Sequence, residues 1–153
     1  MYSLNEEKAL KQRFWDCFGT YCKPRLMEEG KRSWLMYNTR IKGLELKFAL
    51  SRSMVSTMIE INHRDEDRRL RIYEALNDYR SLIDDGLDQI DWQLAAVNDA
   101  GRDVSQIRIV MPDVDYLDTV RWPEVYAFMY QSMSQLENNF LDIHDSLKNE
   151  LKQ

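Results

Sequence analysis

Apolar and polar residues alternate along two neighbouring segments near the middle of the chain. The residues on the apolar side are Leu44, Leu46, Phe48 and Leu50 in the first segment and Val55, Thr57, Ile59 and Ile61 in the second. Thr57 is included because it falls in step with this alternation. Alternation of period two predicts half-buried strands. A loop from Ser51 to Met54 would join the two strands and place Leu46 opposite Ile59, so that the residue numbers of each opposing pair add up to 105. This register keeps the apolar sides of both strands together.

An amphipathic helix is predicted before these strands. It begins at Ser3 or Asn5, where Ser3 and Glu6 form a capping-box pattern, and its apolar residues recur every three to four positions. Pro24 lacks a backbone donor, so we expect the helix to end there. The segment 24–42 has no clear period and is predicted to be a loop with at most one short helical turn.

Two further helices follow the strands in the sequence. Asp65 is placed as an N-cap, and the helix after it is predicted to end near Gly86. Its charged start, HRDEDRRLR, is interpreted as a set of salt bridges along the helix. The last helix opens at Trp122-Pro123 and keeps its apolar spacing almost to the end of the chain.

A second hairpin is predicted between these two helices, with its loop from Asn98 to Asp103. Its apolar face comprises Ile90, Trp92, Leu94 and Ala96 on one strand and Ile107, Ile109 and Met111 on the other. The order helix, hairpin, helix, hairpin, helix predicts an α+β fold, a four-stranded antiparallel sheet with helices packed on one face. The length predicts a single domain, 1–153.

Composition narrows the classes of function. Asp and Glu outnumber Lys and Arg by 26 to 21, so any attraction to nucleic acid requires a local basic patch. The sequence shows neither a membrane-length apolar run nor signal-peptide features, so we expect a cytoplasmic protein with no membrane partner. Cys17 and Cys22 point to different sides of the first helix and are interpreted as core thiols. With no zinc-type spacing and no glycine-rich phosphate loop, we predict neither a metal site nor a cofactor.

Four sequence blocks carry a family resemblance: FWDCFGTYCKP, WLMYNTRIKGLELKF, MIEINH and RWPEVYAFM. In these blocks, and over nearly its whole length, the chain resembles a bacterial family catalogued as domain of unknown function 4268. The resemblance implies no activity. Some members stand alone, and in others a similar domain follows a nuclease-like domain of the PD-(D/E)xK type, for which 153 residues leave no room. The nuclease association is therefore an analogy at the level of the fold.

The sequence Glu45-Leu46-Lys47 resembles the Glu-x-Lys step of such nucleases. In the predicted register, Glu45 lies opposite Glu60 and Lys47 lies diagonally beside it, so two acids and a lysine converge. The same residues would also form the solvated face of a hairpin, where Lys47 relieves repulsion between the two acids. No Asp occurs between residues 24 and 44, where the nuclease pattern requires one, which favours the solvated face.

A local excess of positive charge lies between Lys23 and Lys42. Six cations face only Glu28 and Glu29, and two aromatic residues are interleaved with them. These candidate ligand-binding residues are Lys23, Arg25, Lys31, Arg32, Trp34, Tyr37, Arg40 and Lys42. Cations with aromatic side chains suit single-stranded nucleic acid or a phosphorylated ligand. Alternatively, Trp34 and Tyr37 pack under the sheet while the charged groups remain in water.

The remaining candidates are two histidines and the last helix. His63 precedes a helix and is interpreted as a hydrogen-bonding residue, and His144 is expected on a solvated helix face. The apolar stripe of the last helix needs cover from the first helix or from a second chain, which suggests a homodimer. The sequence therefore predicts a non-enzymatic binding or accessory module for nucleic acid, phosphate or an acidic protein. The alternatives are a PD-(D/E)xK-type nuclease and a purely structural interaction module.

Overall fold

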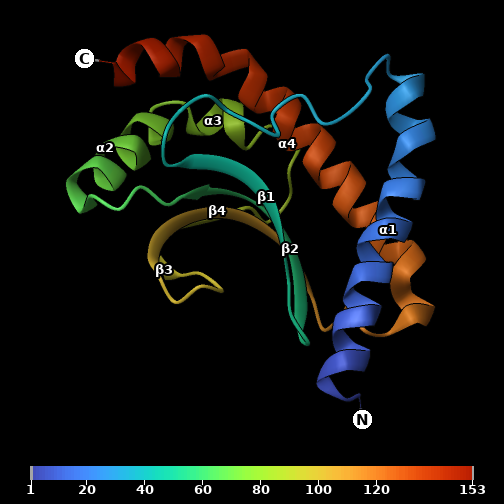
Figure 1. Cartoon of the computed structure of the whole chain (residues 1–153). Helices are drawn as coiled ribbons and strands as arrows, with labels where there is room; N and C mark the ends of the chain where they lie inside the picture. Colours follow the sequence, from blue (N-terminus) through green and yellow to red (C-terminus); the bar gives the residue numbers. More distant parts are fainter. Residues whose placement is uncertain (1, 153) are drawn as a thin grey trace.

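The computed structural model describes residues 2–152 and has the predicted α+β order (Figure 1). The helices lie on one side of a bent sheet, and β3 curls back on the other side. The elements are α1 (Leu4–Glu28), β1 (Leu44–Leu50), β2 (Met54–Ile61), α2 (Glu66–Asn77), α3 (Arg80–Ile83), β3 (Asp91–Val97), β4 (Asp103–Pro112), η1 (Thr119–Arg121) and α4 (Trp122–Leu151). In the described part of the chain, no helix is both long and apolar enough to span a membrane.

The four strands form one antiparallel sheet in the order β1-β2-β4-β3. The predicted register of the first hairpin is confirmed, because Leu46 pairs with Ile59 and Leu44 pairs with Ile61. A slip of one residue would turn the apolar side of β2 away from the helices. The hydrophobic pattern is therefore sufficient to define this pairing.

The second hairpin departs from the predicted alternation at a bulge. Trp92 pairs with Ile107, but the register shifts between Gln93 and Ala96. A bulge places an extra residue on one strand and reverses which side the following residues face. Leu94 is consequently half exposed, and its prediction as part of the apolar face was wrong.

The first helix continues through Pro24 to Glu28, so the prediction that Pro24 ends it was wrong. Proline removes one backbone hydrogen bond, to the carbonyl of Thr20. Both Thr20 and Pro24 are exposed, so that carbonyl is open to solvent. Cys22 and Leu26, on either side of Pro24, are buried in the core, which holds the chain in the helical path. Burial also raises the pKa of the Cys22 thiol to about 12.

The predicted single helix from Asp65 to Gly86 is two helices, and this prediction was wrong. α2 ends at Asn77, and the four-residue α3 follows after a break at Tyr79, which has φ −104° and ψ 16°. Asn139 of α4 donates from Nδ2 to the carbonyl of Ile83, at 2.9 Å, and so holds the end of α3. Both helices can then bury their apolar residues against α4.

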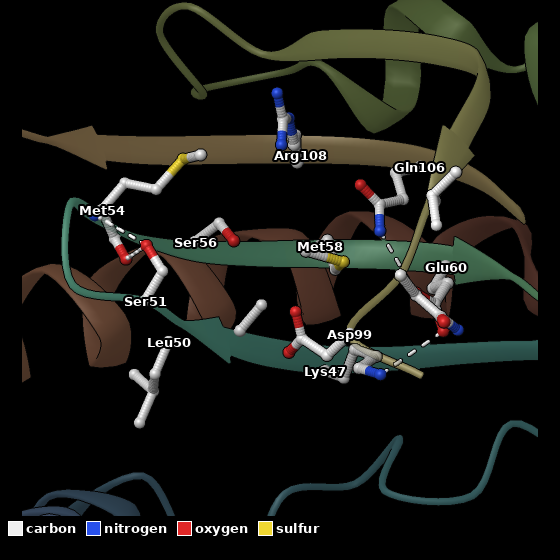
Figure 2. A pocket seen from close by; sticks show the side chains of 13 residues that line it. Lys47, Leu50, Ser51, Met54, Ser56, Met58, Glu60, Asp99, Gln106 and Arg108 are labelled. Atoms are coloured by element: carbon white, nitrogen blue, oxygen red, sulfur yellow. Dashed lines mark hydrogen bonds and ion pairs between the residues drawn. The ribbon is translucent and has the colours of Figure 1, made fainter. Parts of the chain in front are cut away.

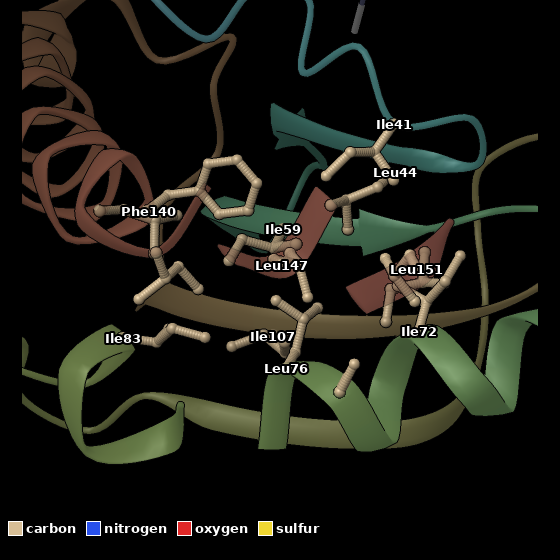
Figure 3. Close-up of a cluster of buried hydrophobic side chains, with 14 of the residues drawn as sticks. Ile41, Leu44, Ile59, Ile72, Leu76, Ile83, Ile107, Phe140, Leu147 and Leu151 are labelled. Carbon is tan, nitrogen blue, oxygen red and sulfur yellow. The ribbon is translucent and has the colours of Figure 1, made fainter. Parts of the chain in front are cut away.

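The core lies between the sheet and the helices, and Ile59 is at its centre with no exposed surface (Figure 3). α4 is about 45 Å long and contributes along most of its length. The predicted apolar stripe at its end is 4% exposed or less within this single chain, and it comprises Phe140, Ile143, Leu147 and Leu151. Its cover comes from α2 and the sheet rather than from the first helix. A homodimer is therefore not needed to cover this stripe.

Candidate functional site

The three residues of the Glu-x-Lys hypothesis meet on one side of the sheet, since Lys47 lies within 3.7 Å of both acids. Figure 2 shows two of them, Lys47 and Glu60, on the side that faces away from the helices. Glu45 pairs directly with Glu60, as predicted. Glu60 is only 1% exposed, however, so its assignment to a solvated face was wrong. Two features account for this burial. β2 lies between β1 and β4 in the sheet, and residues of the β3–β4 loop line a pocket together with Glu60.

Three donors surround the buried Glu60 carboxylate. Lys47 Nζ lies 3.4 Å from Oε2, Asn62 Nδ2 lies 3.1 Å from Oε2, and Gln106 Nε2 lies 3.2 Å from Oε1. Asn62 also donates to Glu45 Oε1 at 3.0 Å and so links the two acids. Donors to the charged form offset the cost of burying it. Sequence reasoning missed Asn62 and Gln106, since Gln106 reaches Glu60 only through the β2–β4 pairing.

We expect Glu60→Gln to lower the free energy of unfolding by about 1–3 kcal/mol, because it weakens charge-assisted hydrogen bonds and presents an amide to buried donors. Glu45→Gln should change it by less than about 0.5 kcal/mol, because Glu45 is half exposed. Urea unfolding of both variants measures the difference. Equal values would mean that the hydrogen bonds around Glu60 do not contribute to stability.

The nuclease hypothesis requires an aspartate close to Glu45 and Glu60. Asp99 is the only aspartate among the residues lining the pocket beside Glu60. Within residues 2–152, no three His, Cys, Asp or Glu side chains are grouped so that they could hold a metal ion. Lys47 lies 3.7 Å from Glu45 and 3.4 Å from Glu60, as an ion-pair partner of both acids. The geometry thus assigns to these residues a hydrogen-bonded network within the sheet.

The basic segment predicted between Lys23 and Lys42 is divided by the fold. Lys23 and Arg25 belong to α1, and the Arg25 guanidinium stacks 3.6 Å from the centre of the Tyr21 ring. Lys31 is mostly buried and lies 3.6 Å from the Glu137 carboxylate of α4. Lys31 therefore serves an internal ion pair, and Arg32 remains exposed nearby in the sequence.

Residues 29–42, which we call the strap, run beside α4 and are held by three of its side chains seven residues apart. Tyr130 donates to Glu29 at 2.7 Å, Glu137 accepts from the Met36 amide at 2.8 Å, and His144 Nε2 lies 2.6 Å from the Thr39 carbonyl. A spacing of seven residues keeps side chains on one helix face. The prediction of His144 on a solvated face was wrong, because the strap covers that face.

Burial is the main cause that raises the pKa of Tyr130 to about 12, and the hydrogen bond to Glu29 acts in the same direction. The phenol therefore stays protonated at neutral pH and can serve as the donor to Glu29. This bond fixes the start of the strap against α4.

The two aromatic residues of the strap have different environments. Trp34 packs against Tyr130 and Phe48, with ring centres 5.4 and 6.4 Å apart, as the packing alternative predicted. Tyr37 is 78% exposed, so the prediction that it too packs under the sheet was wrong. Both residues line a mainly apolar pocket of about 150 Å³ between the strap, β1 and α4. Tyr37 is thus the aromatic ring that a ligand can reach.

Arg40 and Lys42, at the other end of the strap, meet cations that come from distant parts of the sequence. They line a pocket of about 350 Å³ together with Arg68 of α2 and with Lys148 and Lys152 at the end of α4. None of the residues that line this pocket is acidic. We call these five cations the basic pocket. Its last three members were missed because only the tertiary fold brings them to the strap.

Two arginines from the charged start of α2 bind the end of α4. Arg68 donates from Nη2 to the Leu151 carbonyl at 2.7 Å, and Arg71 donates to the Glu150 carbonyl at 2.8 Å. The last carbonyls of a helix lack partners within it and carry partial negative charge. These two arginines therefore cap α4, and Arg68 also brings positive charge to the pocket lined by Arg40 and Lys42.

Comparison with known proteins agrees with the resemblance seen in the sequence. No curated protein and no solved structure matches this chain. One family does match, described as a domain of unknown function (DUF4268), and it covers residues 10–144. This range contains every element from most of α1 to most of α4, including the whole strap. The chain therefore belongs to the DUF4268 family.

Proposed function

We propose that this protein is a non-catalytic binding module for single-stranded nucleic acid. Phosphates bind at the basic pocket, and a base stacks on Tyr37. The observation that carries this proposal is the convergence of Arg40, Lys42 and three further cations around one pocket, in a chain whose net charge is −5.

The charge distribution supports a polyanionic ligand. A protein with excess negative charge attracts a polyanion only where cations are concentrated. Arg40 and Lys42 are exposed, as is Lys152, so these groups can contact phosphate oxygens. Arg68 is tied to the end of α4 and adds charge from a fixed position. Arg40 has φ 60°, a conformation uncommon for a side chain of this size, so the local backbone is held by its surroundings.

The position of Tyr37 supports a single strand rather than a duplex. Tyr37 lies three residues before Arg40, a span of about 10 Å at most. A base on its ring and a phosphate at the basic pocket can therefore belong to one short strand. Unpaired bases expose the faces that stack on aromatic rings, and bases within a duplex do not.

Fluorescence anisotropy with labelled single-stranded DNA and RNA measures this binding across a salt series. If roughly three to five phosphates are bound, log K should fall with log salt at a slope of about −2 to −3.5. The double variant Lys42→Gln/Lys148→Gln should reduce the magnitude of this slope by about 0.7 for each phosphate that it no longer neutralises. The matched control Lys8→Gln/Arg102→Gln removes the same charge from exposed positions outside the basic pocket and should retain the slope.

Tyr37→Ala separates stacking from charge. It should weaken binding by about five- to a hundredfold, the range for one stacked base, without changing the salt slope. Tyr37 is exposed, so the variant should remain folded.

The other outcomes contradict the proposal in distinct ways. No binding at low salt, or equal slopes for the wild type and the basic-pocket variant, would leave a protein or a small phosphorylated ligand as the partner. Cleavage of the strand that requires Mg²⁺ and disappears in Glu45→Gln or Lys47→Ala would instead support the nuclease alternative.

A further inference from the structure

The pocket between the strap, β1 and α4 contains one buried acid. Most of its walls are apolar or aromatic and include Trp34 and Phe48. Among the described residues that line it, Glu137 of α4 is the only acid, and it is 1% exposed. The one cation of this set is Lys47, which lies 3.4 Å from Glu60. The formal charges of the lining residues therefore cancel, which favours an uncharged ligand group over an ion.

One oxygen of the Glu137 carboxylate lacks a hydrogen-bond donor. Oε2 accepts the Met36 amide at 2.8 Å. Oε1 is buried, and within residues 2–152 it accepts no hydrogen bond. Lys31 Nζ lies 3.6 Å from Oε1, an ion-pair distance that is too long for a hydrogen bond. A buried acceptor without a donor is costly, so a ligand that donates to Oε1 is stabilised there.

The size of the pocket and the exposed ring beside it limit the ligand. The volume is about 150 Å³, and a cavity of about this size holds one six-membered ring. A pyrimidine therefore fits better than the two fused rings of a purine. Tyr37 is exposed and lines the pocket, so its ring can stack on a base that enters. The terminal torsion of a glutamate is soft, so a small rotation turns Oε1 toward the ligand.

We propose that this pocket takes a cytosine base, so that the protein prefers cytosine over thymine and uracil. The inference rests on the proposed binding of a single strand and names the base that this site selects. The N4 amino group of cytosine donates to Glu137 Oε1, and the ring stacks on Tyr37. Aspartate and glutamate accept hydrogen bonds from this amino group in base recognition. Thymine and uracil have a carbonyl oxygen at the same position, which a carboxylate repels.

Fluorescence anisotropy with labelled oligodeoxycytidine and oligothymidine of roughly ten nucleotides measures this preference. Both strands carry the same phosphate charge, so a difference between them isolates the base. The titrations are made at slightly alkaline pH, where oligodeoxycytidine stays single-stranded, and at one salt concentration. The cytidine strand should bind about five- to a hundredfold more tightly, the range for one base-specific contact.

A strand of 2-pyrimidinone deoxynucleotides keeps the cytosine ring and lacks only its amino group. It should lose most of the advantage of the cytidine strand, because no hydrogen remains to donate to Glu137. This comparison uses the wild-type protein, so its result does not depend on the folding of a variant.

Glu137→Gln tests the same contact from the side of the protein. The amide oxygen can still accept the Met36 amide, but an NH₂ group takes the place of Oε1. The two strands should then bind with nearly equal Kd. Glu74→Gln removes the same charge from an exposed position on α2 outside the pocket and should retain the preference. Circular dichroism and an unchanged salt slope verify that Glu137→Gln is folded with its basic pocket intact.

The failure of this inference and the failure of the proposed function give different results. Equal binding of the cytidine and thymidine strands, with the salt slope expected from the basic pocket, would overturn the cytosine preference alone. Binding of neither strand would overturn both proposals. Undiminished binding of the pyrimidinone strand, or a preference that persists in folded Glu137→Gln, would show that Glu137 does not recognise the amino group.

Discussion

Replacing Gly43 by alanine should lower the free energy of unfolding by about 3 kcal/mol or more. Gly43 has φ 82°, a backbone conformation that side chains rarely adopt. An added Cβ would also lie 2.4 Å from the His63 Cβ and 2.9 Å from its Cα and backbone nitrogen. Backbone atoms cannot move aside as a flexible side chain can, so the chain at Gly43, just before β1, and the chain at His63, just after β2, would have to separate.

The matched control is Gly101→Ala in the β3–β4 loop. Gly101 has a similar φ of 76°, but nothing lies within 4 Å of the position of its Cβ. This variant bears only the conformational cost, about 1–2 kcal/mol. Urea unfolding monitored by circular dichroism compares the two. Equal losses would show that the close approach of Gly43 to His63 does not constrain the fold.

Truncating Ile59 to alanine should cost about 3–5 kcal/mol, the largest loss expected for a single core residue on the sheet. Ile59 has no exposed surface and belongs to the larger core cluster, which also contains Leu44, Ile107 and Phe140. Its neighbours lie on rigid strands and on α4, so they cannot close the cavity that the missing methyl groups leave.

Leu4→Ala provides the comparison, because it removes a similar side chain that is 87% exposed at the start of α1. That change should fall within about 0.5 kcal/mol of the wild type. Thermal unfolding and urea unfolding together measure both variants. Stability of Ile59→Ala close to the wild type would mean that the apolar side of β2 does not face the helices.

Most of the fold was predictable from local patterns. The capping pattern at Ser3 is confirmed, since its hydroxyl accepts the Glu6 amide at 3.1 Å. The register of the first hairpin followed from matching two apolar faces across a short loop. Such features depend on residues that are close in the sequence. The spacing of the apolar residues is enough to predict which side of each element is buried.

Predictions failed where contacts between distant segments outweighed local preference. Pro24 would end an isolated helix, but the burial of Cys22 and Leu26 continues it. The spacing of α4 places His144 on what looks like its polar side, yet the Thr39 carbonyl of the strap lies against it. In both cases the outcome depends on packing against another segment of the chain. The apolar spacing within the helix itself does not reveal that segment.

The candidate sites show the same division. The hairpin that brings Glu45 opposite Glu60 could be predicted from residues close along the chain, and so could the excess of positive charge around Arg40 and Lys42. The burial of Glu60, and the completion of the basic pocket by Arg68 and the end of α4, result from the packing of segments that are distant in the sequence. The reason is physical: burial and local charge depend on every element packed around a residue, and the alternation of one strand cannot show what covers it.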